Sequence, residues 1–382
     1  MSDIEACIER AREALHEQNA KEALRILKPF KKSLKTTNGS NVLLLQTFAN
    51  AYLEDGQLEK AYPLLSRACE ADVEGTQGGS EKFFTLGQVA GGQFGINILL
   101  QGVENVSREA GDNLNQEQIG KIVSGLLSMV EIWMTDLCME ETAEAQSEEL
   151  VSKAMEISDG VSPEVWSTLG SIRISQQRYK EAVDAFIQSW TFFEMRKQEI
   201  EKSLNDADGS TYEDYVQLLQ PLLTLAKMCI EMGLYDISLK IVSAIKDIDE
   251  DNLEAYYLEG FTYYMISKME MFKNTNPTAN VTAENIFEFN QHFKEVPLSL
   301  NNESISEVVH EARLALSFAS KIGGNCDATD EVIYELLMGT KELLEELGGP
   351  LNDKELMKAR KGEAEDDNDN AEFDLDNIGD ED

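Results

Sequence analysis

Apolar residues recur along this chain with the spacing of one face of an α-helix, and rarely with the alternation of a β-strand. Only seven prolines are present in 382 residues, so few positions oppose helix formation. The pattern therefore predicts an all-α protein whose successive helices pair into hairpins. The predicted pairs cover residues 3–35, 41–72, 116–158, 163–200, 213–247 and 252–322, and residues 83–110 are predicted to be helical but rich in glycine.

One stretch of the chain carries the tetratricopeptide repeat pattern W-x2-L-G…A-x3-F. Its matching residues are Trp166, Leu169, Gly170, Ala182 and Phe186. Two antiparallel helices approach closely only where small residues meet, which is the role expected of the glycine and the alanine in this pattern. The match departs at Arg173, where the pattern has tyrosine. A hairpin of this kind cannot bury its apolar face alone and therefore stacks on its neighbours.

The same small position recurs at Ala226 and Gly260, which are 34 residues apart, the period of this repeat. The second copy has Glu259 where leucine is usual. A helical bundle without true repeats is the alternative, but a recurrence at this period favours repeats. We therefore predict a tetratricopeptide-repeat, right-handed superhelical solenoid of about six to seven hairpins over residues 1–350.

Two segments interrupt or end this pattern. Residues 273–302 are rich in asparagine and proline and predict an insertion inside the last hairpin, with one short helix near 282–293. Such insertions often lie on the binding face, and a neutral surface loop is the equal alternative. A capping helix is predicted over 328–347. Residues 351–382 are expected to form a short helix and an acidic, disordered tail.

The net charge of −38 changes the functional picture. Eleven acidic residues lie between Glu363 and Asp382, so the rest of the chain still carries −27. Such a surface repels nucleic acids and anionic membranes and attracts basic proteins. Acidity that serves only solubility is the alternative, but a charge of this size favours a basic partner and predicts no direct binding to nucleic acid or membrane.

Sequence signals for catalysis are missing. The three histidines, His16, His292 and His310, lie far apart, and no P-loop, Rossmann fingerprint or nucleophile elbow is present. No apolar run is long enough to span a membrane, and the first residues lack an apolar signal segment. We therefore expect no enzyme activity, no cofactor and no metal.

In this repeat architecture the first helix of each hairpin lines the concave face, which usually binds an extended peptide. Mapping the pattern onto these helices gives a mixture of carboxylates, amides and aromatic rings, which suits a ligand that carries lysine or arginine. For the aromatic members, burial between repeats is the alternative. The predicted partner-binding residues are Gln46, Asn50, Glu54, Asp136, Glu140, Glu231, Tyr257, Phe261 and Tyr264.

A groove that binds carboxylates, like that of heat-shock co-chaperones, is the competing interpretation. Such a groove needs inward lysine, asparagine and arginine. Asn50 is in place, but Gln46 stands one turn earlier where lysine is needed, and Lys227 is the one lysine that the pattern places inward. The sequence therefore disfavours a carboxylate-binding groove.

The N-terminal run from Cys7 to Leu34, the acidic repeat body and the acidic tail after Lys361 together resemble one family. It is the fungal assembly chaperone dedicated to the fourth large-subunit ribosomal protein, and the likeness covers most of the chain. The resemblance implies a basic client whose long internal loop is extended before it enters the ribosome. It implies that the concave face holds this loop, and that the complex travels from cytoplasm to nucleus, where the client joins the precursor of the large subunit.

Under this interpretation the protein is a monomer in a 1:1 complex with its client, found in both cytoplasm and nucleus. Two other functions fit the same residues. One is an adaptor or heat-shock co-chaperone, which would bind an acidic C-terminal peptide. The other is a histone-type acidic chaperone, in which the tail rather than the groove makes the main contact.

Overall fold

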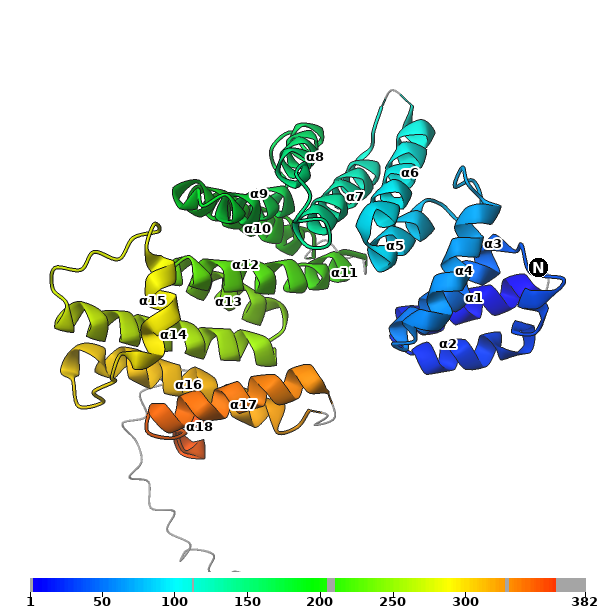
Figure 1. Cartoon of the computed structure of the whole chain (residues 1–382). Helices are drawn as coiled ribbons and strands as arrows, with labels where there is room; N and C mark the ends of the chain where they lie inside the picture. Colours follow the sequence, from blue (N-terminus) through cyan, green and yellow to red (C-terminus); the bar gives the residue numbers. More distant parts are fainter. Residues whose placement is uncertain (1–2, 112, 205–209, 327–329, 362–382) are drawn as a thin grey trace, which may run out of the picture. The chain divides into compact units, whose positions relative to one another are not determined.

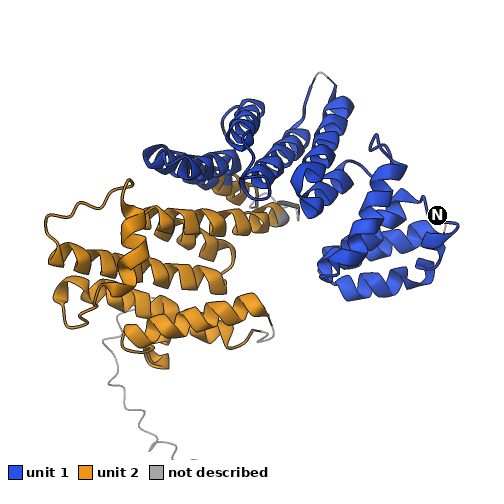
Figure 2. Ribbon diagram, viewed as in Figure 1, with its two compact units in different colours: residues 1–196 blue, residues 197–382 orange. Residues whose placement is uncertain are grey.

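The computed structural model describes residues 3–111, 113–204, 210–326 and 330–361, and within these ranges the chain is helical and contains no strand (Figure 1). The chain forms two compact units, residues 1–196 and 197–382 (Figure 2). The predicted tail, 363–382, lies outside the described residues. The predicted single solenoid over residues 1–350 stays a prediction, and each unit is described by itself below.

Unit 1 consists of consecutive helix hairpins, in which α1 pairs with α2, α3 with α4, α5 with α6, and α7 with α8. In the last hairpin α9 packs on α10, where the hydroxyl of Ser189 donates a hydrogen bond to the carbonyl oxygen of Pro163. Asparagine side chains start several of these helices by accepting a hydrogen bond from a backbone N–H of the first turn, as Asn41 does from Leu44. The helices are α1 Asp3–His16, α2 Ala20–Leu27, α3 Val42–Glu54, α4 Leu58–Ala71, α5 Glu81–Ala90, α6 Gly92–Ala110, α7 Gln116–Met134, α8 Ala143–Ile157, α9 Pro163–Ser175 and α10 Tyr179–Leu204, whose residues from 197 on belong to unit 2.

Unit 2 continues the pattern with the pairs α12/α13 and α14/α16, and α17 packs on α14 and α16. The predicted insertion lies between α14 and α16 and contains one short helix, α15, followed by a 3-10 turn, η3. The elements are α11 Ser210–Gln217, α12 Leu219–Glu231, α13 Tyr235–Ile248, α14 Leu253–Thr275, α15 Ile286–His292, η3 Phe293–Glu295, α16 Ser306–Gly323, α17 Glu331–Glu346 and α18 Asp353–Lys361.

The hairpin α9/α10 shows why the repeat pattern needs its small residues. A Cβ atom added to Gly170 would lie 2.5 Å from the ring of Phe186, which is fully buried. Ala182 on α10 is also fully buried. The two helices therefore meet at a distance that only small residues allow, and the all-α helix-hairpin fold predicted from this pattern is confirmed.

The stretch 83–110, predicted to be helical, forms two helices, α5 and α6, that pack against each other, so the prediction did not place the break between them. Gly91, between them, has φ +61° and ψ −173°, a backbone conformation that an L-residue rarely adopts. Periodicity alone could not reveal this break, because both helices carry the same apolar spacing and the glycines were interpreted as sites of close contact.

Candidate partner-binding surface

The predicted site residues on α3 divide into one buried and two exposed positions. Gln46 is buried, and its side-chain amide donates a hydrogen bond to the carbonyl oxygen of Gly78 at 3.2 Å. Asn50 and Glu54 are exposed. Gln46 therefore holds the loop before α5 in place, while Asn50 and Glu54 present polar groups to solvent.

Glu54 carries the clearer electrostatic signal. Desolvation by the surrounding protein raises the pKa of its carboxyl group, although the residue is exposed overall. No lysine or arginine among the described residues forms an ion pair with it. A carboxylate that is partly desolvated and has no cationic partner gains more than a fully hydrated one from an incoming cation.

The two predicted residues after α7 are both exposed. The carboxylate of Asp136 accepts a hydrogen bond from the backbone N–H of Gly92 at 2.7 Å, so it connects the end of α7 to the start of α6. The side chain of Glu140 lies in the turn that leads to α8. Of the two, Glu140 is the residue whose carboxylate can be changed without removing that connection.

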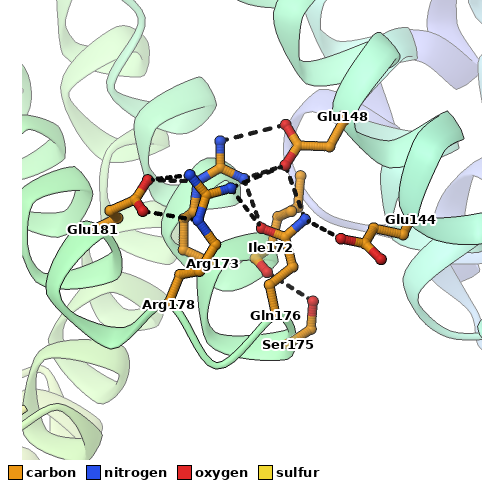
Figure 3. Close-up of polar contacts among 8 residues, drawn as sticks. All are labelled: Glu144, Glu148, Ile172, Arg173, Ser175, Gln176, Arg178 and Glu181. Atoms are coloured by element: carbon orange, nitrogen blue, oxygen red, sulfur yellow. Dashed lines mark hydrogen bonds and ion pairs between the residues drawn. The ribbon is translucent and has the colours of Figure 1, made fainter. Parts of the chain in front are cut away.

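Arg173, the departure from the repeat pattern, forms the centre of a polar cluster between α8 and α9 (Figure 3). Its guanidinium group donates to both carboxylate oxygens of Glu148, and it also donates to the side-chain oxygen of Gln176 at 2.8 Å. Glu259, the second departure, accepts from Lys246 of α13 at 2.6 Å. Both departures therefore pair the first helix of one hairpin with the second helix of the hairpin before it.

The cluster predicts a dependence of unit 1 stability on pH. Burial opposes ionisation of Glu148, but hydrogen bonds from Arg173 and Gln176 outweigh it and lower the pKa of the carboxyl group. A lowered folded-state pKa contributes stability that is present above the unfolded-state value of about 4.3 and is lost as pH falls through the folded-state pKa. We expect Glu148→Gln to destabilise the protein at pH 7 and much less near pH 3.

Urea unfolding of both proteins at several pH values measures this difference. The matched control is Glu149→Gln, on the same helix but with its carboxylate in an exposed ion pair with Lys153. A difference between wild type and Glu148→Gln that stays constant as the pH falls would contradict the assignment.

On α12 the predicted cationic position is already paired. Lys227 lies 2.5 Å from the carboxylate of Glu254 at the start of α14, so its charge is neutralised within the protein. Glu231, one turn later, is exposed, and its backbone carbonyl accepts a hydrogen bond from Asn290 of α15 at 2.7 Å. This pairing agrees with the prediction that the surface is unsuited to a carboxylate ligand.

The three predicted aromatic residues of α14 form a ladder. The ring centroids of Tyr257 and Phe261 are 6.2 Å apart, and those of Phe261 and Tyr264 are 6.3 Å apart, with the rings stacked in both pairs. Tyr257 and Phe261 are half-buried, whereas Tyr264 is only 1% exposed and donates a hydrogen bond to Glu346 of α17 at 2.6 Å. For Tyr264 the structure therefore agrees with the alternative interpretation, in which the aromatic side chain is buried rather than available to a ligand.

Sequence reasoning missed the residues that cover this ladder. Phe293, in the insertion, makes T-shaped contacts with Phe261 and Tyr264. Lys268 on α14 is fully buried and lies 2.5 Å from Glu346. A lysine inside an otherwise apolar helical run was the available signal, because a buried lysine needs a partner.

Within the described residues no helix is long and apolar enough to cross a membrane, and no group of three or more potential metal ligands lies together. The predicted residues fall in both compact units and include acidic, amide and aromatic groups.

Residues 251–371 match the family model described as the ACL4 C-terminal domain. Over 360 residues, 93% of this chain and 95% of the relative, the chain is 27% identical to a probable assembly chaperone of rpl4 from Schizosaccharomyces pombe. A second protein of that description, from Emericella nidulans, is 25% identical over 74% of this chain and 70% of its own length.

The chain resembles the fungal assembly chaperones of rpl4. A solved structure titled as the assembly chaperone of RpL4 (Acl4), residues 1–338, matches with a TM-score of 0.52 and 22% identity, covering 72% of this chain and all of that one. This likeness supports the fold. The family-model match begins at the start of α14, so the aromatic ladder, the insertion and α16–α18 all lie within the matched segment.

Proposed function

We propose that this chain is an assembly chaperone for a basic ribosomal protein of the large subunit, the protein for which its fungal relatives are named. The observation that supports this most is the similarity to those relatives over 93% of the chain. The acidic composition, with a net charge of −38, provides the matching chemistry. Together with a helical-repeat fold, these features favour a binding protein over an enzyme.

The proposed mechanism follows from charge and chain entropy. A disordered basic segment binds RNA non-specifically through its charges, and an acidic surface that occupies those charges prevents this. Ordering an extended segment is costly, so the affinity must come from many weak contacts along it. We propose that exposed carboxylates such as Glu54, Glu140 and Glu231 supply the electrostatic part and that Tyr257 and Phe261 stack on arginine side chains.

In this proposal the protein is a monomer that binds one client, accompanies it from the cytoplasm to the nucleus, and releases it as it joins the precursor of the large subunit. Release requires no nucleotide, because ribosomal RNA offers a denser array of negative charges. Binding is expected to weaken as salt increases, since the screening length shortens from about 10 Å at 0.1 M to about 3 Å at 1 M.

A triple charge reversal tests the proposed surface. We expect Glu54→Lys, Glu140→Lys and Glu231→Lys in one chain to weaken binding of the client's basic loop about tenfold, because each exposed ion pair contributes roughly 0.2–1 kcal/mol. The matched control reverses the same number of exposed acidic residues on second helices of hairpins: Glu59→Lys, Glu156→Lys and Asp236→Lys. Calorimetry with the purified loop measures both.

Equal losses in the two triple variants would mean that net charge alone, rather than the predicted positions, provides the affinity. Deletion of residues 363–382 tests the histone-type alternative, which predicts that this deletion abolishes binding of the client. Under our proposal the deletion weakens binding modestly, mainly at low salt.

Preferential binding of an acidic C-terminal peptide would instead support the heat-shock co-chaperone alternative. Recovery of many unrelated partners from cell extract would contradict a dedicated client.

A further inference from the structure

The insertion between α14 and α16 is folded onto the face that the repeat pattern assigns to the ligand. Figure 1 shows α15 crossing α14 near the end of α12. Ile286 and Phe289 on α15 are buried, and the ring of Phe289 lies 5.6 Å from that of Phe272 on α14. The insertion therefore packs on α14, the helix that carries the predicted partner-binding residues Tyr257, Phe261 and Tyr264.

The next residues of the insertion cover the aromatic ladder directly. The ring centroid of Phe293 lies 6.2 Å from that of Phe261 and 6.1 Å from that of Tyr264, with interplanar angles of 75° and 85°. In such pairs the positive edge of one ring lies against the negative face of another. A guanidinium group favours the same position over a ring face, so an arginine side chain and Phe293 would compete for it.

A polar contact attaches the end of this segment. The ammonium group of Lys268 donates to the backbone carbonyl of Val296 at 2.6 Å, and the same group pairs with Glu346. If Val296 leaves, Lys268 keeps its carboxylate partner. The buried charge therefore remains compensated when the insertion is detached, which lowers the cost of detachment.

Two observations indicate that the segment is attached loosely. The side-chain oxygen of Asn290 is buried without a hydrogen-bond partner, although its amide nitrogen donates to Glu231. Release would return this acceptor to water and recover the cost of its desolvation. The connecting residues 276–280 are all exposed, so the chain leading into the segment is not held by packing.

We propose that residues 286–296 form a removable cover over the aromatic ladder of α14, and that an arginine-rich segment displaces it. This inference rests on the proposed function, because it assumes that the ladder binds the client. In the absence of a client the cover shields Phe261 and Tyr264 from water and from unsuitable partners. Client binding exchanges Phe293 for arginine side chains and exposes residues 286–296.

Hydrogen exchange of the full wild-type chain tests, without a mutation, whether a bound peptide displaces residues 286–296 from α14. The probe is an unstructured arginine-rich peptide, compared with a lysine-rich peptide of the same length and charge. With the arginine-rich peptide bound, amides of residues 286–296 should lose protection while those of α14 keep or gain it. Increased protection of 286–296 would show that the insertion is a fixed wall of the binding surface and would overturn the proposal.

The variant Phe293→Ala tests the competition. It should raise the affinity for the arginine-rich peptide about three- to tenfold, because the apparent affinity scales with the fraction of uncovered molecules. Thr278→Ala, an exposed change in the same insertion, is the matched control and should leave the affinity unchanged. If the wild type binds the arginine-rich peptide and Phe293→Ala binds it no more tightly, the proposed cover is overturned while the proposed function stands. Failure of both proteins to bind any basic peptide contradicts the proposed function itself.

Discussion

Replacing Lys82 with methionine is expected to lower the free energy of unfolding of unit 1 by about 3–5 kcal/mol, because it leaves a buried carboxylate without its partner. The ammonium group of Lys82 is fully buried and lies 2.8 Å from the carboxylate of Asp72. It also donates to the carbonyl oxygen of Gly79 at 2.5 Å. The pair thus holds the glycine-rich loop between α4 and α5, and its loss affects the packing of the two hairpins on each other.

The measurement is urea unfolding followed by tryptophan fluorescence. All three tryptophans, Trp133, Trp166 and Trp190, lie in unit 1, so the signal reports this unit without contribution from the other. Lys121→Met is the control, since Lys121 forms ion pairs with Glu81 and Glu117 at the surface. Its effect should not exceed about 1 kcal/mol. Similar effects of the two changes would show that the Lys82 pair is hydrated rather than buried.

Phe186→Ala is expected to cost about 3–5 kcal/mol, because it removes a fully buried aromatic ring and leaves a cavity beside Gly170. The close packing of α9 on α10 depends on this ring, since the backbone of Gly170 packs directly against it. The same fluorescence measurement applies, although Trp166 and Trp190 lie on the affected hairpin and their folded-state signal must be recorded for each variant.

Phe94→Ala provides the matched control for the ring. Phe94 lies on α6 in the same unit and is 51% exposed. Its replacement should change the free energy of unfolding by no more than about 0.5 kcal/mol. A loss below about 1 kcal/mol for Phe186→Ala would mean that the hairpin closes over the cavity, and that the small residue at 170 does not set the distance between the helices.

The fold was largely predictable because its determinants are local. Hairpin contacts such as Gly170 with Phe186 join residues close in sequence, so a short pattern records them. The break at Gly91 was missed because it leaves the helical period unchanged on both sides. The departures at Arg173 and Glu259 looked like imperfect repeats, yet each forms an ion pair with the preceding hairpin, which a pattern for a single hairpin does not contain.

The candidate surface was less predictable, because exposure depends on residues distant in sequence. Position within a repeat identified Glu54, Glu140 and Glu231, which the structure leaves exposed. It could not identify Gln46 as buried, since its partner is the carbonyl of Gly78 in a loop 32 residues away. The role of these positions in binding a partner stays a prediction that the triple charge reversal tests.

The sequence by itself determined the helix hairpins and the acidic character, because helical period, small residues at close contacts and net charge are properties of neighbouring residues or of composition. Only the tertiary structure decided which side chains remain accessible. Tyr264 is buried because Glu346, 82 residues later, accepts its hydrogen bond and because Phe293 packs on its ring. Burial depends on which distant segment folds back over a helix, and a local pattern carries no record of that.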